Sequence, residues 1–150
     1  MHAIATELEN IIDKRVTALK KMTEDIFSAK PFPEKWSKKE IMGHLVDSAQ
    51  SNIRRFVVAQ YEENPFIVYN QEKWVTIINY QQWKTADIID LWYLLNKQVC
   101  AILRNTPEAM YGRKCLTGES HTIEWLARDY VKHLLHHLHV VLDLEPIPYS

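Results

Sequence analysis

The stretch WSKKEIMGHLVDSA, residues 36–49, decides the fold, because it marks the start of a long helix. The Ser37 hydroxyl can accept a hydrogen bond from the backbone N–H of Glu40, and the Glu40 carboxylate can reach back to the N–H of Ser37. This reciprocal arrangement is a capping box, the strongest local helix signal in the chain. We therefore predict a helix from residue 37 to about residue 62, before an Asn-Pro pair.

Three further long stretches carry apolar side chains at spacings of three, four and seven residues, the pattern of one buried helix face. These stretches cover residues 2–28, 85–105 and about 122–143. We expect Thr85 to cap the second of them, and Asn70 to cap a shorter helix that runs to about Tyr80. Four long amphipathic helices with one long crossover predict an all-α four-helix bundle, with no sheet beyond a stray pair of strands.

Composition limits the classes of protein that this chain can be. It is 47% hydrophobic and 25% charged, as a globular protein is, and we expect one domain over residues 1–150. Eighteen basic and nineteen acidic residues give a net charge of -1, which argues against a nucleic-acid-binding domain. No apolar run is long enough to span a bilayer, and residues 1–25 do not resemble a signal peptide. The two cysteines suit a reducing compartment, so we predict a cytoplasmic protein without membrane partners.

Histidine is unusually frequent, and four of the seven histidines crowd into residues 133–139. His133 and His137 lie one turn apart on the apolar face of the last helix, so we expect both to point inward. His136 and His139 fall on the polar face, where we expect solvated surface side chains. Two imidazoles one turn apart can bind a common metal ion, but a stable site needs a third ligand.

His44 is the candidate third ligand, because it lies on the inward face of the helix that begins at Ser37. The side chains after it are more polar than an ordinary core requires: Asp47, Ser48, Ser51 and Arg55. A metal ion with its water would give such groups partners. Three histidines and one open position are typical of a catalytic zinc site. Two alternatives stay open, namely core histidines without a metal and a fourth protein ligand, Cys115.

Residues 36–49 resemble the second-helix motif of the DinB-like superfamily, and HLLHH at residues 133–137 is similar to its H-x-x-H-H motif on the last helix. The resemblance covers about residues 1–143. It implies a four-helix bundle of up-down-down-up topology, a long crossover after the second helix, and a homodimer. It also implies a divalent metal ion, zinc or nickel. By motif position its ligands are His44, His133 and His137.

Relatives in this superfamily resemble thiol-dependent transferases and isomerases. The resemblance therefore implies a metal-dependent enzyme that activates a low-molecular-weight thiol, or water in a hydrolase, for reaction with a small-molecule substrate. Asp47, one turn from His44, is the candidate catalytic residue, either orienting that ligand or acting as a base. A surface ion pair with Arg54 or Arg55 is the alternative role for Asp47. The pocket candidates are Ser48, Arg55 and Tyr130. The alternative function is a non-enzymatic metal-binding or partner-binding bundle.

Overall fold

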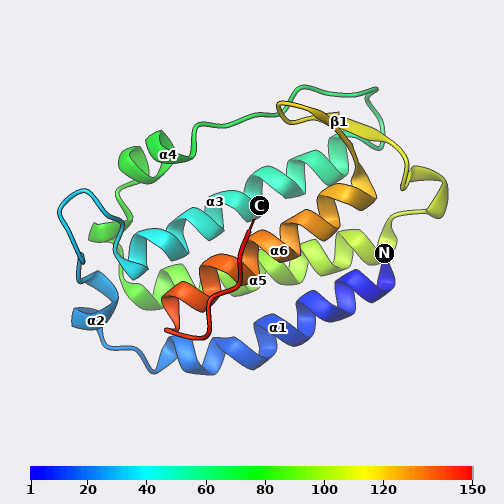
Figure 1. Cartoon of the computed structure of the whole chain (residues 1–150). Coiled ribbons are helices and arrows are strands. Elements are labelled where there is room, and N and C mark those ends of the chain that lie inside the picture. Colours follow the sequence, from blue (N-terminus) through cyan, green and yellow to red (C-terminus); the bar gives the residue numbers. More distant parts are fainter. Residues whose placement is uncertain (150) are drawn as a thin grey trace.

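The computed structural model describes residues 1–149, which are mainly helical (Figure 1). The long helices are α1 (His2–Lys20), α3 (Lys38–Val58), α5 (Thr85–Asn105) and α6 (Ile123–Val141). The shorter elements are helices α2 (Glu24–Ser28) and α4 (Gln71–Ile78), the 3-10 turns η1 (Tyr80–Gln82) and η2 (Glu108–Met110), and strands β1 (Lys114–Leu116) and β2 (Ser120–Thr122). The two strands pair with each other as an antiparallel hairpin. The predicted all-α four-helix bundle is confirmed.

Contacts near the helix ends show how the long helices lie against one another. α3 and α5 end side by side, because Gln60, just beyond α3, donates to the hydroxyl of Thr106, just beyond α5, over 3.3 Å. α6 packs against α3 in the opposite direction, since Lys38 at the start of α3 forms an ion pair with Asp143 after the end of α6. Figure 1 shows α1 and α5 also running in opposite directions. The segment that contains α4 connects α3 to α5 and passes along the outer side of α3.

The first helix is shorter than the sequence predicts. The apolar pattern indicates one helix over residues 2–28, but α1 ends at Lys20 and α2 begins at Glu24. The Thr23 hydroxyl accepts a hydrogen bond from the backbone N–H of Ile26, so it caps a separate short helix. As a consequence Ile26, which the pattern places on the buried face, is 54% exposed.

The capping box at the start of α3 is present as predicted. The Ser37 hydroxyl accepts from the N–H of Glu40 over 3.0 Å, and the Glu40 carboxylate accepts from the N–H of Ser37 over 3.1 Å. α3 ends at Val58 and not near residue 62. The guanidinium of Arg113 binds two backbone carbonyls of the turn that follows, so these carbonyls need no further helical turn.

The other predicted caps have mixed outcomes. The side chain of Asn70 accepts from the backbone N–H three residues further on, so this cap is confirmed. Thr122, near which the last helix is expected to start, also caps its helix, because its hydroxyl accepts from the N–H of Trp125. The predicted cap at Thr85 is wrong. Thr85 is the first residue of α5, and its hydroxyl donates to the carboxylate of Glu24 on α2. This contact ties the short α2 to the start of α5.

The close approach of η1 to α3 depends on Gly43. The ring of Tyr80 lies against this glycine so closely that a Cβ at position 43 would be 2.1 Å from Tyr80 Cδ2. The Tyr80 side chain is buried, and its hydroxyl donates to the carboxylate of Asp47, one turn further along α3. Glycine is therefore required at position 43 for steric reasons.

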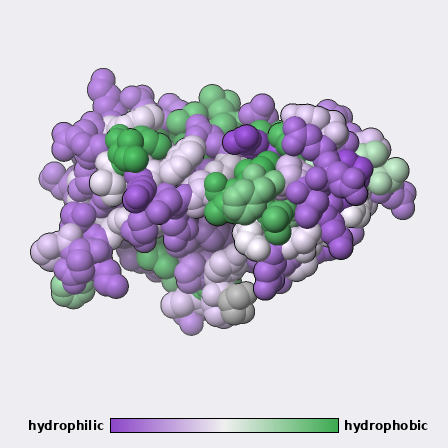
Figure 2. All heavy atoms as spheres, turned by 90° about the horizontal axis from the view of Figure 1, so that it is seen from above, coloured by the Kyte–Doolittle hydropathy of each residue, from purple (hydrophilic) through white to green (hydrophobic). Residues whose placement is uncertain are grey.

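The surface that Figure 2 shows is mostly hydrophilic, with hydrophobic side chains in small separate groups. Large exposed apolar side chains on the segment between α3 and α5 include Phe66, Val68 and Ile77. Among residues 1–149, no helix is both long and apolar enough to cross a membrane.

Gly43→Ala is expected to lower the free energy of unfolding by about 2 kcal/mol. Displacing the buried Tyr80 ring destabilises the fold by more than the higher helix propensity of alanine stabilises it. Chemical denaturation measures this change. Gly112→Ala is the matched control, since no atom lies within 4 Å of a Cβ at that position. Equal stability of the two variants would contradict the close approach of η1 to α3.

Candidate metal centre

Three histidine side chains meet between α3 and α6. His44 comes from α3, and His133 and His137 come from α6; their candidate ligand atoms all lie within 4.8 Å of one another. Nε2 of His44 is 3.1 Å from Nε2 of His133. The ring centroids are 4.6 to 5.0 Å apart. The fold therefore brings the predicted inward pair, His133 and His137, together with the predicted third ligand, His44.

Local structure explains this arrangement. His133 and His137 are four residues apart, so their side chains lie one above the other on α6. His44 lies about two turns after the cap at Ser37, on the face of α3 that packs against α6. Its side chain is 1% exposed, and the ring of Trp36, with a centroid distance of 5.2 Å, lies beside it.

All three imidazoles are neutral at pH 7. Burial, together with the nearby rings of His133 and His137, lowers the pKa of His44 to about 3. Burial also lowers the pKa of His133 and of His137 to about 4, with smaller contributions from neighbouring histidines. A neutral imidazole keeps a nitrogen lone pair that can bind a cation, whereas an imidazolium ion does not.

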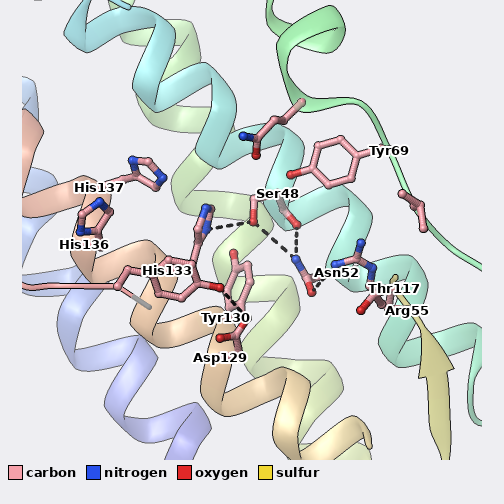
Figure 3. Close-up of a pocket in the computed structure, with 13 residues that line it drawn as sticks. Ser48, Asn52, Arg55, Tyr69, Thr117, Asp129, Tyr130, His133, His136 and His137 are labelled. Atoms are coloured by element: carbon pink, nitrogen blue, oxygen red, sulfur yellow. Dashed lines mark hydrogen bonds between the residues drawn. The ribbon is translucent and has the colours of Figure 1, made fainter. Parts of the chain in front are cut away.

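A chain of polar contacts on α3 supports the ring of His133 (Figure 3). Nδ1 of His133 lies 3.5 Å from the hydroxyl oxygen of Ser48. The side-chain amide of Asn52 donates to the Ser48 carbonyl over 2.8 Å and lies 3.4 Å from the same hydroxyl. When Nδ1 of His133 donates to Ser48, its Nε2 keeps the lone pair and faces His44. A partner of this kind orients a metal-binding histidine and selects its tautomer.

A pocket of about 400 Å³ adjoins the histidines, and Figure 3 shows its walls. The three predicted pocket residues, Ser48, Arg55 and Tyr130, all line it. The hydroxyl of Tyr130 already donates its proton to the side-chain oxygen of Asn96, over 2.6 Å.

Sequence reasoning missed several residues of the same wall, namely Asn52, Tyr69, Asp129, His136 and Tyr149. Asn52 follows Ser48 by four residues, so helical spacing could have identified it. Tyr69 and Tyr149 lie in irregular segments, where spacing predicts no neighbour.

Asp47 is separate from this pocket. Its side chain is 0% exposed, and the hydroxyl of Tyr80 donates to one carboxylate oxygen. The other oxygen has no hydrogen-bond partner among the described residues. Burial raises the pKa of Asp47 to about 6, and the hydrogen bond from Tyr80 opposes this rise. A buried contact with Tyr80 therefore replaces the surface ion pair with Arg54 or Arg55 that was one alternative.

His136 and His139 are not the solvated side chains that the helical pattern indicates. Nδ1 of His136 is 2.6 Å from the carbonyl oxygen of Ile147, and Nδ1 of His139 is 2.7 Å from that of Glu145. These bonds hold the segment after α6 against the helix. The ring of Tyr149 is consequently brought to 5.3 Å from the ring of His133.

Cys115 does not join the histidine cluster. Its buried thiol donates to the carbonyl oxygen of Pro65 over 3.3 Å. The other cysteine, Cys100, is a small buried residue whose thiol donates to the carbonyl of Ala5. Among the described residues, the group that could hold a metal ion therefore consists of histidines alone.

The fold and this site define a helical bundle with a three-histidine cluster between two antiparallel helices. The chain belongs to the DinB superfamily, whose family model matches residues 7–141. The resemblance that two sequence motifs indicate is confirmed.

Among solved structures, YfiT from Bacillus subtilis is similar to this chain; it is described as a probable metal-dependent hydrolase with an unusual four-helix bundle topology. The TM-score is 0.83 at 23% sequence identity, and the match covers 94% of this chain and 83% of that chain. At this identity the likeness shows the fold. No curated protein matches the chain significantly.

The burial of Asp47 predicts a pH dependence of stability. Its pKa rises from 3.8 to about 6 on folding, so the folded state binds the proton more tightly. This contribution to stability is fully present below the unfolded pKa and is lost as the pH rises through the folded pKa, by about 3 kcal/mol in all.

Asp47→Asn keeps an acceptor for Tyr80 but cannot ionise, so it isolates this effect. In urea denaturation of chelator-treated protein from pH 4 to pH 8, wild type should lose about 2 kcal/mol relative to the variant, because part of the full effect is already lost at pH 4. A stability difference that does not change with pH would show that Asp47 titrates normally.

Proposed function

We propose that this chain is a metal-dependent enzyme in which His44, His133 and His137 bind one divalent cation, zinc or nickel. The convergence of three neutral imidazoles, two of which line a pocket, carries the proposal. The donor set fits such an ion, because imidazole nitrogen is a preferred ligand of both metals. Three protein ligands leave room for a further ligand, as in catalytic zinc sites.

The proposed reaction is transfer of a low-molecular-weight thiol to an electrophile, with hydrolysis as the variant reaction. A divalent ion held by neutral ligands would lower the pKa of a thiol or a water molecule towards neutrality. The description of YfiT as a probable metal-dependent hydrolase supports the hydrolytic variant.

The side chains of this protein hold and enclose the site. Ser48 orients His133, and the ring of Trp36 packs beside His44. The pocket would admit a small molecule beside His133 and His137. Asp47, the candidate base, is buried against Tyr80 and is not among the residues that line the pocket. We therefore assign Asp47 no contact with the substrate.

We also propose that the four long helices follow an up-down-down-up order with the long crossover after α3. The adjacent ends of α3 and α5 and the opposite course of α3 and α6 support this order. A cytoplasmic location and a homodimer stay predictions, and sedimentation of a species heavier than 17.7 kDa would support the dimer.

Replacing His133 or His137 by alanine is expected to abolish stoichiometric metal binding, because two imidazoles hold a divalent ion far less tightly than three. Elemental analysis of purified protein measures the metal content. His136→Ala and His139→Ala are matched controls on the same helix and should keep one ion per chain. Full metal content in His133→Ala would show that the assigned ligands are wrong.

Turnover tests the enzymatic part of the proposal. Metal-loaded protein is screened with several small thiols against electrophiles, and with activated esters and amides. Activity should disappear on chelation and return when the metal is restored, and His137→Ala should be inactive while His139→Ala is active. If the metal site is filled and neither class of substrate reacts, a metal-binding bundle without enzymatic activity is the better account.

A further inference from the structure

Arg55 is a cation in the pocket beside the three histidines without an anionic partner among the described side chains. Its Nε donates to the carbonyl oxygen of Ile67 over 3.1 Å, and its Nη1 lies 3.4 Å from the side-chain oxygen of Asn52. A guanidinium has further N–H groups, so donors remain for a ligand. Asp129 lines the same pocket, but its carboxylate accepts from the hydroxyl of Tyr149 over 2.8 Å.

The surroundings of Arg55 favour an anion. Burial lowers the pKa of Arg55, and electrostatic contributions from Tyr69, Cys115, Asp129 and Tyr149 oppose this only in part. The guanidinium lies 5.9 Å from the centroid of the Tyr69 ring, which gives its flat face an aromatic contact but no neutralising charge. A partly desolvated guanidinium gains most from a carboxylate that can accept two parallel hydrogen bonds.

The helix places this cation at a defined distance from the histidines (Figure 3). Asn52, beside the guanidinium, follows Ser48 by four residues, which is about 6 Å along the helix axis. Ser48 in turn contacts the ring of His133. An anion beside Asn52 therefore lies about 6 Å along the helix axis from Ser48 and the Nδ1 side of His133, a separation of about four covalent bonds. Nε2 of His133, which faces His44, lies on the far side of that ring.

We propose that the substrate of this site is a small carboxylic acid, whose carboxylate binds Arg55 while its reactive atom, at least four bonds away, lies at His44, His133 and His137. The position of the reactive atom rests on the proposed metal-dependent function. A carboxylate fits better than a phosphate ester, because the Asp129 carboxylate, which lines the same pocket, opposes a second negative charge.

Two thiol probes of equal length test this inference, 4-mercaptobutyrate and its neutral amide, 4-mercaptobutanamide. Calorimetric titration of metal-loaded wild type should show the carboxylate binding about tenfold more tightly than the amide, as expected for a charge-assisted pair of hydrogen bonds. Equal binding of acid and amide would overturn the inference. Tighter binding of 3-mercaptopropylphosphonate would overturn the choice of carboxylate over phosphate.

Variants of two adjacent arginines locate the effect. Arg55→Gln should bind the acid about tenfold more weakly and leave the affinity for the amide unchanged. Arg54→Gln removes the same charge from an exposed position on the same helix and should bind both probes as wild type does. Arg55→Lys keeps the charge without the planar pair of donors, so its affinity for the acid should lie between that of wild type and that of Arg55→Gln. Equal affinities of Arg55→Gln and Arg54→Gln for the acid would refute the role of Arg55.

A metal-free arm separates this inference from the proposed function. Butyrate and butanamide are titrated into chelator-treated wild type, Arg55→Gln and Arg54→Gln, with circular dichroism confirming that each variant folds. If butyrate binding depends on Arg55 and the protein takes up no metal, the carboxylate site is supported. The proposed metal-dependent function is then wrong. If the protein binds metal fully but the affinity for butyrate does not depend on Arg55, only the carboxylate site is wrong.

Discussion

The antiparallel packing of α6 against α3 is the contact on which the candidate site depends. At one end of this pair Lys38 meets Asp143, and about two turns further along α3 His44 lies 3.1 Å from His133. Successive residues of a helix point about 100° apart, so a shift of one residue in α6 would turn its histidine pair away from His44. The ion pair and the histidine contact therefore require the same register.

The buried polar side chains of α3 divide into two groups with different surroundings. His44 and Ser48 contact His133 of α6, and Ser48 and Asn52 line the pocket, whereas Asp47 faces Tyr80 of η1. Buried polar groups destabilise a fold unless they are paired, and most of these are. Two buried side-chain atoms of this helix have no hydrogen-bond partner in the described part of the chain, Nδ1 of His44 and Oδ2 of Asp47. The sequence places these polar side chains on one helix, which suggests a single site. In the structure they lie in two separate environments, and only one of these adjoins the pocket.

Irregular segments complete the pocket that the two helices begin. Tyr69 comes from the segment before α4, and Tyr149 from the segment after α6. His136 and His139 hold that last segment in place through its backbone carbonyls. The four histidines of residues 133–139 therefore have two roles, one pair meeting His44 and the other pair holding the segment that carries Tyr149. Arg55 adds a positive charge to this wall, at a distance along α3 that a small acid can span.

The sequence by itself determined the places of the four long helices, the caps at Ser37 and Asn70, and the inward positions of the three clustered histidines. These features depend on hydrogen bonds and side-chain spacing within a few residues, which the order of residues specifies directly. Only the tertiary structure decided that Thr85 binds Glu24, that Asp47 faces Tyr80, and that Tyr69 and Tyr149 border the pocket. Each of these contacts joins segments far apart in the chain, or lies in a segment without periodicity, so no local pattern could specify it.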